Sequence, residues 1–442
     1  MNRFFRPDGE EVYPKRVYAR LDSAEPQVDG SSLLAFDAID AYAIDDVSDL
    51  RLIRAVNPNS PIATASICAV TIASTDLATP STPPDDSEFD QGSWHQLDLD
   101  YENGGPALVY ASLGAIGRPA YVRRFQPVPD QKAADLSAAF SLDDYIASSM
   151  DIEAALSRVR TITHITVYDV GQGSASGLNS AIGAPELYFD FGGGVLVHKP
   201  TFPTALTGFC FSQNPTVVLS HWDWDHWSSA DLFQASTQLT WIAPNQKLGA
   251  IHATFGALIV ANGKLLIWPT HLAAAQNHTG SVRIVRCTGA GRNHSGLAAE
   301  VHGPNGELPI LLTGDARYSA IPGAQANRYS SIVVPHHGAD MKLAAVPSCP
   351  THPNGRLVYS CGQPNNFGHP RAITKQNHAA AGWVHNSVRS AGVARFTYHR
   401  WPHGLGHVAI GWKSGLLGNG MPCGATANAS SSGTCALAPY QD

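Results

Sequence analysis

Two histidines and two aspartates lie within six residues of one another near the middle of the chain. They are His221, Asp223, Asp225 and His226, and they follow a short apolar run in the stretch TVVLSHWDWDHWSSA of residues 216–230. The run is typical of a buried strand, and a strand that ends abruptly presents the next side chains from a rigid base. Imidazole nitrogen together with carboxylate oxygen suits a divalent metal ion of borderline hardness. Four such side chains at this spacing predict a metal site rather than a polar turn whose histidines are incidental.

Later apolar runs of the chain end in the same types of side chain, and strand ends can converge at a common edge of one or two sheets. The residues in such positions are Asp169, Asp190, Asp315, His336, His337 and His369. Asp315 has two carboxylate oxygens and could bridge two metal ions. Taken singly, each of these residues could be an ordinary turn or surface residue. Their joint occurrence with residues 216–230 predicts one shared site.

The strands that must position these side chains are frequent in the later two thirds of the chain, whereas long helices are few. This pattern indicates two sheets with helices on the outside, an α/β arrangement. Helices are predicted at residues 141–160, where Ser141 and Asp144 resemble a capping box, at 228–235 and at 371–391. Strands are predicted at residues 162–168, 187–191, 195–197, 239–243, 265–268, 282–287, 297–301, 310–313, 331–334, 357–360 and 395–399.

The motifs around these residues resemble those of the metallo-β-lactamase fold. HWDWDH, from His221 to His226, is similar to the HxHxDH motif of that fold, with Asp223 where the second histidine usually stands. The other motifs occur in the order typical of one branch, the metallohydrolase domain of the competence protein ComEC and its soluble relatives. They are DVGQG at 169–173, FDFGGG at 189–194, LLTGDA at 311–316, VPHHGA at 334–339 and NNFGHP at 365–370. The resemblance covers residues 161–412 and says nothing about residues 1–150.

The resemblance implies a four-layer αββα sandwich that holds two divalent metal ions, Mn²⁺ or Zn²⁺. An aspartate in place of a histidine makes the ligand set richer in oxygen, which favours Mn²⁺ without excluding Zn²⁺. His294, in the segment RNHSG, matches no histidine of the family, so its role as a ligand stays open. The metal ligands that the resemblance implies are His221, Asp225, His226, Asp315 and His336, with Asp223 at a further ligand position.

The function expected from this resemblance is metal-assisted hydrolysis of a phosphodiester, as in a phosphodiesterase or nuclease. Asp223 or Asp225 could orient the attacking water. His337 or His369 could donate to the developing oxyanion or protonate the leaving group, and His369 could instead be a ligand. Two alternatives stay open: a hydrolase of a small ester, lactone or amide, and a partner-binding protein stabilised by its metal.

The composition bounds the partners and the compartment. The formal net charge is −7, so a nucleic acid or nucleotide substrate would be held by metal ions or local patches rather than by an overall basic charge. The sequence has no apolar run of 18 residues and no secretory signal, so no membrane span is expected. Seven scattered cysteines without a CxxC motif predict a reduced, cytoplasmic protein.

Three regions are predicted along the chain. Residues 1–150 read as a strand-containing accessory domain, interrupted by a Pro/Ser/Asp-rich loop at 75–94, that could dock a protein partner. Residues 155–415 form the hydrolase domain, and residues 416–442 are a Gly/Ser/Ala-rich tail. Without membrane helices or a basic groove, this chain acting alone is not expected to serve as a DNA-uptake channel.

Overall fold

The computed structural model describes residues 2–5, 11–50, 53–55, 57, 60–77, 92–341, 346–350, 355–384, 393–400 and 404–412. They group into two compact units, residues 1–144 with 247–262 and residues 145–246 with 263–442. The predicted domain ranges 1–150 and 155–415 remain predictions, and the structure adds that residues 247–262 group with the first unit. The predicted tail at 416–442 lies outside the described residues.

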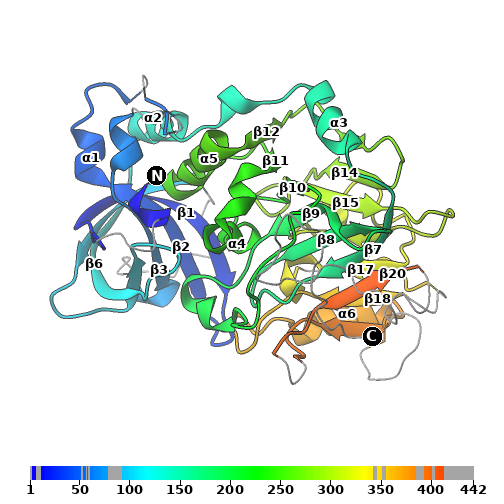
Figure 1. Ribbon diagram of the computed structural model, residues 1–442. Helices are drawn as coiled ribbons and strands as arrows, with labels where there is room; N and C mark the ends of the chain where they lie inside the picture. Colours follow the sequence, from blue (N-terminus) through cyan, green and yellow to red (C-terminus); the bar gives the residue numbers. More distant parts are fainter. Residues whose placement is uncertain are drawn as a thin grey trace. The chain divides into compact units, whose positions relative to one another are not determined.

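The first unit contains a closed antiparallel barrel of six strands in the order β1-β2-β3-β5-β6-β4 (Figure 1). Apolar side chains at alternate positions of the strands point into its interior, which is filled by residues such as Val17, Phe36, Val70 and Leu97. The strands are β1 Arg16–Pro26, β2 Ser32–Asp40, β3 Ile67–Ala73, β4 Trp94–Asp100, β5 Ala107–Tyr110 and β6 Arg118–Pro127. The helices of this unit are α1 Ala41–Asp45, α2 Asp130–Ala139 and α5 Ala250–Asn262.

Helix α5 is joined to the barrel through its first turn. The backbone N–H groups of Ile251 and His252 donate to the carboxylate of Asp37 on β2, at 2.8 Å and 3.3 Å. The His252 ring also lies 2.8 Å from the carboxylate of Asp22 on β1. An acidic side chain at a helix N-terminus satisfies N–H groups that have no partner within the helix. The barrel thus supplies the cap of a helix that comes from a distant part of the chain.

The second unit is built from two mixed sheets of seven strands each (Figure 1). The first has the order β12-β11-β10-β9-β8-β7-β20, and the second has the order β13-β14-β15-β16-β17-β18-β19. The first sheet comprises β7 Ile162–Val167, β8 Ala175–Ser180, β9 Pro185–Phe191, β10 Thr216–Val218, β11 Thr240–Pro244, β12 Lys264–Trp268 and β20 Val408–Gly411. The second comprises β13 Ala274–Gln276, β14 Val282–Arg286, β15 Leu297–Val301, β16 Ile310–Leu312, β17 Ser331–Val333, β18 Arg356–Tyr359 and β19 Val393–Phe396.

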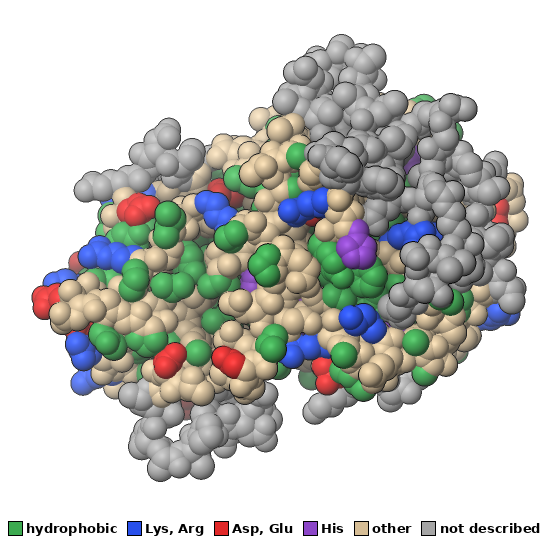
Figure 2. Space-filling model, turned by 90° about the horizontal axis from the view of Figure 1, so that it is seen from below, with side chains coloured by type: hydrophobic (Ala, Val, Ile, Leu, Met, Phe, Trp, Pro, Cys, Tyr) green, Lys and Arg blue, Asp and Glu red, His purple; other side chains and the backbone are tan. Residues whose placement is uncertain are grey.

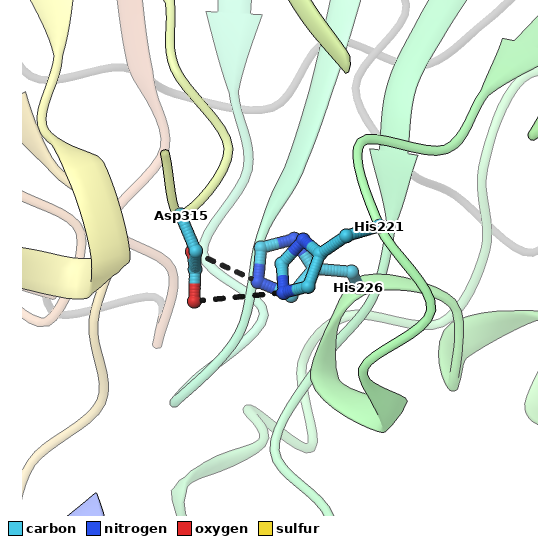
Figure 3. A group of neighbouring side chains, drawn as sticks. All are labelled: His221, His226 and Asp315. Atoms are coloured by element: carbon cyan, nitrogen blue, oxygen red, sulfur yellow. Dashed lines mark ion pairs between the residues drawn. The ribbon is translucent and has the colours of Figure 1, made fainter. Parts of the chain in front are cut away.

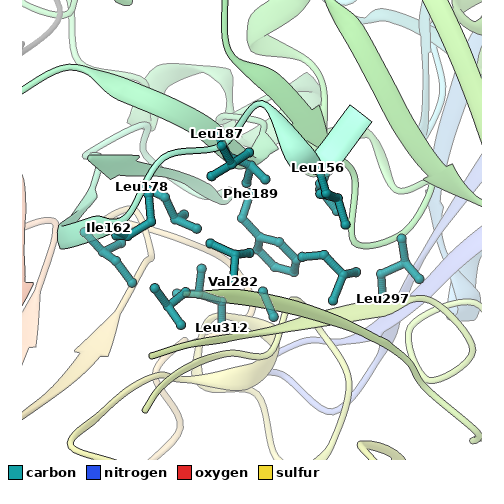
Figure 4. Packing of buried hydrophobic residues seen from close by; sticks show 14 of the residues in the cluster. Leu156, Ile162, Leu178, Leu187, Phe189, Val282, Leu297 and Leu312 are labelled. Atoms are coloured by element: carbon teal, nitrogen blue, oxygen red, sulfur yellow. The ribbon is translucent and has the colours of Figure 1, made fainter. Parts of the chain in front are cut away.

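The main core lies between the two sheets. Phe189 and Leu187 of the first sheet pack against residues such as Val282 and Leu312 of the second, and Leu156 of α3 (Ser149–Ser157) joins them (Figure 4). Apolar side chains from two facing sheets exclude water along their whole contact, which is the dominant stabilising term of such a fold.

Helices cover the outer faces. On the second sheet, α6 (Ala372–Ala380) contributes His378, whose Nε2 lies 2.8 Å from the Tyr318 hydroxyl in an outer apolar cluster with Tyr359. Beside the first sheet lies α4 (Ser229–Leu232), followed by a turn whose Ser236 carbonyl accepts from the Trp241 indole. The predicted four-layer αββα sandwich is thereby confirmed.

Three predicted elements differ from the structure. The predicted helix at 141–160 is only the shorter α3, whose capping box is formed by Ser148 and Asp151 rather than by Ser141 and Asp144. The predicted strand at 195–197 is wrong: a 3₁₀ helix, Leu196–Thr201, follows the three glycines, because the Gly194 N–H donates to the carbonyl of Val170 and turns the chain.

The predicted helix at 371–391 corresponds to α6, which ends before Gly382. That glycine has φ +94°, a conformation that stops a helix. Residues 385–391 lie outside the described residues. No helix in the described part of the chain is both long and apolar enough to cross a membrane.

Candidate metal centre

The cluster begins where two parallel strands of the first sheet end side by side. Asp190 on β9 accepts hydrogen bonds from the backbone N–H of Ser220 (2.6 Å) and from its hydroxyl (2.9 Å), just beyond β10. The same carboxylate lies 2.8 Å from Nδ1 of His226. Asp190 therefore fixes the start of the HWDWDH loop and directs Nε2 of His226 away from itself.

The glycines of two motifs allow this loop to pack tightly against the sheet. The backbone carbonyl of Asp225 accepts from the N–H groups of Ser174 and Gly193, at 3.0 Å and 3.1 Å. A Cβ atom on Gly192 would lie 1.7 Å from that carbonyl oxygen, so only glycine fits there. The FDFGGG motif thus positions the metal loop rather than supplying ligands.

Asp315, which follows β16 of the second sheet, stands at the centre of the cluster. Its Oδ1 lies 3.1 Å from Nε2 of His226, and its Oδ2 lies 3.8 Å from Nε2 of His221 (Figure 3). His336 and His337 approach the same carboxylate from the end of β17: Nε2 of His336 is 3.5 Å from Oδ2, and Nε2 of His337 is 3.8 Å from Oδ1. Each oxygen of Asp315 therefore faces its own set of ligand-type side chains.

These sets are called the first group and the second group below. The first group faces Oδ2 and consists of His221, His336 and Asp223, whose Oδ2 lies 3.2 Å from Nε2 of His221. The second group faces Oδ1 and consists of His226, His337 and Asp225; the Asp225 carboxylate lies 3.1 Å from Nε2 of His337 and 3.9 Å from Nε2 of His226.

The two adjacent histidines reach different oxygens because of an uncommon backbone. His336 and His337 both have positive φ, +49° and +55°, in the PHHG turn. Such a conformation is costly for residues other than glycine and is found where function requires a set orientation. Nδ1 of His337 lies 2.7 Å from the carbonyl of Ser360, so Nδ1 carries the proton and Nε2 is left to act as a ligand.

The buried atoms of the cluster fit a bound metal ion. Among the side chains of the two groups and Asp315, four buried ligand-type atoms lack a hydrogen-bond partner: Nε2 of His221, His226 and His337, and Oδ1 of Asp315. Ligand atoms of His221, His226 and Asp315 all lie within 4.8 Å of one another, as do those of Asp225, His226 and His337. Unpaired buried polar atoms are costly, and divalent cations bound at the cluster would satisfy them.

Mutual attraction of opposite charges also sets the pKa values of the cluster. Burial lowers the pKa of the His226 imidazole, but the carboxylates of Asp315, Asp190 and Asp225 outweigh burial and hold it well above its usual range.

The same attraction acts on the other partners. The pKa of His337 is raised, against burial, by Asp315 and Asp225. Burial raises the pKa of Asp315, but the surrounding histidines hold it well below its usual range. A metal ion must therefore displace protons from these imidazoles, which makes its affinity depend on pH.

Three further histidines lie beside the two groups. Burial holds the pKa of His369 well below its usual range; its ring is 5.7 Å from that of His336, and its Nδ1 lies 3.3 Å from Nε2 of Gln172. His294 is half-buried, and burial and Arg317 lower its pKa to about 4. Neither His369 nor His294 belongs to a ligand group, and their predicted roles stay predictions.

The sequence analysis did not single out His198. Its ring packs 4.4 Å from that of Phe367, and burial lowers its pKa to about 4, against the attraction of Asp225. It follows the FDFGGG motif inside a 3₁₀ helix, so no strand-end pattern marks it. His337 was expected as a catalytic residue, whereas the structure places its Nε2 among the ligand-type atoms of the second group.

Two stacked sheets with a buried cluster of histidines and aspartates at their strand ends make up the metallo-β-lactamase fold, and this chain has that fold. The fold and the cluster are defined by the chain's own strand order and side chains.

No protein-family model and no curated protein matches the sequence. Among solved structures, the chain is similar to a protein of unknown function from Enterococcus faecalis, with a TM-score of 0.25 and 12% identity over 39% of this chain. The chain spans 49% of that protein's length. Zinc-bound PqqB from Methylobacterium extorquens gives a TM-score of 0.32 and 9% identity over 51% of this chain and 98% of its own.

A metallo-β-lactamase of Cronobacter sakazakii with a HARLDQ motif gives a TM-score of 0.24 and 15% identity over 40% of this chain and 67% of its own. Similarity at this level carries no information about substrate or activity.

Proposed function

We propose that this protein is a metal-dependent hydrolase that cleaves a phosphodiester in a nucleic acid or nucleotide. The observation that carries the proposal is the division of four histidines between the two oxygens of Asp315, with Asp223 beside His221 in the first group and Asp225 beside His337 in the second. Such a division suits two neighbouring divalent ions, Mn²⁺ or Zn²⁺, with a histidine-rich and oxygen-rich ligand set at each. When bound, a pair of divalent ions activates water for attack and neutralises charge on a phosphate.

The side of the cluster nearest Asp225 and His336 is the side open to a substrate. The side chain of Asp225 is 27% exposed and that of His336 is 13% exposed, whereas those of His221, His226 and Asp315 are at most 3% exposed. On this side, Asp225 is the carboxylate best placed to accept a hydrogen bond from the attacking water and orient it.

His369 is the side chain best suited to donate a hydrogen bond to the developing oxyanion. The Gln172 amide is oriented by the Gly362 N–H, which donates to its Oε1 at 3.3 Å, so its Nε2 faces Nδ1 of His369. An amide nitrogen donates, so Nδ1 accepts and the proton of the neutral His369 ring resides on Nε2. A neutral imidazole with its proton on a set atom can donate a hydrogen bond to a developing oxyanion.

Local positive charge supports an anionic substrate. Arg317 follows Asp315 by two residues, and the backbone N–H of Arg371 donates to the carbonyl of Gly338, next to His337, at 2.8 Å. On the face drawn in Figure 2, lysine and arginine side chains of the described residues lie scattered rather than gathered in one field. The arginines near the cluster would hold a phosphate locally.

The finer assignments remain part of this proposal. They comprise the relationship to ComEC, the choice between Mn²⁺ and Zn²⁺, a cytoplasmic location, and a protein partner bound through residues 1–150. The five cysteines described by the structure are all free, which agrees with a reducing compartment.

Metal analysis followed by a substrate screen tests the function. The full-length protein is assayed for bound metal by elemental analysis, stripped with a chelator, and reconstituted with Mn²⁺ or Zn²⁺. We expect hydrolysis of bis(p-nitrophenyl) phosphate or single-stranded DNA that needs the added ion, at least about a hundredfold above the stripped protein. Cleavage of p-nitrophenyl acetate or a lactone instead, with no phosphodiester cleaved, would favour the small-ester alternative. Bound metal without any hydrolysis would favour the partner-binding alternative.

A further inference from the structure

A short segment of the second unit is built directly onto the HWDWDH loop. The backbone N–H of Leu297 donates to the carbonyl of Ser220 at 2.7 Å. Gln246 bridges the two segments: its Oε1 accepts from the N–H of Trp222 at 3.2 Å, and its Nε2 donates to the carbonyl of Arg292 at 2.7 Å. These contacts fix the backbone of Arg292 relative to the metal loop.

From this position the Arg292 side chain forms an ion pair with the carboxylate of Asp223 in the first group. Its Nη1 donates to Oδ1 of Asp223 at 3.1 Å, and the two side chains are only 7% and 10% exposed. The other oxygen of Asp223 lies 3.2 Å from Nε2 of His221. A buried ion pair is screened little by water, so the guanidinium charge acts on whatever binds at the first group.

The histidines of the two groups also differ in the side chain that their Nδ1 atom contacts. Nδ1 of His226, in the second group, lies 2.8 Å from the carboxylate of Asp190. Nδ1 of His221, in the first group, lies 2.9 Å from the hydroxyl of Ser220, which itself donates to Asp190. A carboxylate behind an imidazole raises its basicity as a ligand more than a neutral hydroxyl does.

We propose that Arg292 makes the two metal positions unequal, so that the second group binds its ion tightly and the first group binds a weaker, exchangeable ion. The proposal rests on the two-metal centre of the proposed function and adds how that centre fills. The guanidinium neutralises part of the Asp223 charge and repels a second cation, and the ion at the first group is therefore gained only at higher concentrations of free metal.

Calorimetric titration of the metal-free, full-length protein with MnCl₂ tests this directly. In the parent protein we expect two binding steps of unequal affinity. Arg292→Gln removes the positive charge and leaves a side chain that can still donate to Asp223. We expect the weaker step to tighten at least about tenfold, because the repulsion is removed, while the tighter step changes less than about twofold. Arg292→Lys keeps the charge and should leave both steps close to those of the parent.

Arg283→Gln is the matched control, because Arg283 pairs with another buried carboxylate, that of Glu300, at 2.6 Å on the neighbouring strand. This variant should titrate like the parent. Asp223→Asn gives a second route if Arg292→Gln does not fold: it should weaken only the weaker step, at least about tenfold.

Two equal steps in the parent, or a weaker step that Arg292→Gln leaves unchanged or loosens, would overturn the inference. Equal steps in a protein that still cleaves phosphodiesters would refute the inference and leave the function standing. Unequal binding steps in a protein that hydrolyses none of the substrates would support the inference and refute the proposed function.

Discussion

Among the side chains of the second group, Asp225 is the most exposed, and it contacts the imidazoles of both His226 and His337. Asp225→Asn keeps the shape of the side chain but removes the charge that would hold a divalent ion and orient water. We expect a loss of at least about a hundredfold in the rate of phosphodiester hydrolysis at saturating Mn²⁺. The fold should be retained, because the residue lies in a loop and fills no part of the apolar core.

Two further substitutions sharpen this test of Asp225. Asp231→Asn makes the same chemical change six residues later, in α4, and should keep the rate within about threefold of the parent protein. Asp223→Asn should lose activity at low Mn²⁺ and recover much of it at high Mn²⁺, because its effect is on the weaker metal position. Parent-like activity of Asp225→Asn would contradict the metallohydrolase proposal.

At the level of single residues, the sequence predicted which side chains gather but not the part that each plays. His221, His226 and Asp315 come together as expected, because each follows a strand and strand ends meet at one edge. The division between His336 and His337 depends on two consecutive residues with positive φ, which no sequence pattern signals. Arg292 was missed because its partner Asp223 is 69 residues away, and a lone arginine in a loop carries no spacing signal.

At the scale of whole elements, the contact between α5 and the barrel should make the stability of the folded protein depend on pH. Burial raises the pKa of Asp37 to about 6, against the attraction of His252 and the N–H groups of α5. Since this pKa lies above the unfolded value of 3.8, the folded state binds the proton more tightly. The stabilisation of the folded state by the bound proton of Asp37 is therefore complete below about pH 4 and is lost as the pH rises through about 6.

Asp37→Asn removes this titration and allows it to be measured as a difference between two proteins. We expect the stability of the parent relative to the variant to fall by up to about 3 kcal/mol between pH 4 and pH 8. Hydrogen exchange of the backbone amides of α5 measures the same loss of stability locally. Asp29→Asn is the control: hydrogen bonds from Ser31 lower the pKa of this exposed residue, so its difference curve should be flat over this range. A flat curve for Asp37→Asn as well would show that Asp37 does not titrate there.

For the molecule as a whole, the sequence predicted the layered fold of the second unit because its strands are continuous apolar runs with ligand residues at their ends. The closed barrel of the first unit was predicted only as a strand-containing region. Its closure requires β4 to pair not only with β6 but also with β1, which is distant from β4 in sequence. Likewise, α5 was not assigned to the first unit, because Asp37 is 214 residues from its partner Ile251.

Metal binding should stabilise the second unit and leave the first unchanged, because both ligand groups belong to residues 145–246 and 263–442. An ion that binds only the folded state adds about 2.7 kcal/mol at one hundred times its Kd. We expect Mn²⁺ at pH 7.5 to raise hydrogen-exchange protection in β10, β16 and β17, with little change in β1–β6.

The effect should fade as the pH falls toward 5, since protons then compete with the ion for imidazoles whose pKa values the carboxylates raise. Na⁺ at equal ionic strength is the control for screening. His226→Ala should remove the response, because the ligand atom of His226 lies within 4.8 Å both of those of His221 and Asp315 and of those of Asp225 and His337. Equal protection of both units by Mn²⁺, or a response that persists in His226→Ala, would show that the ion binds elsewhere on the chain.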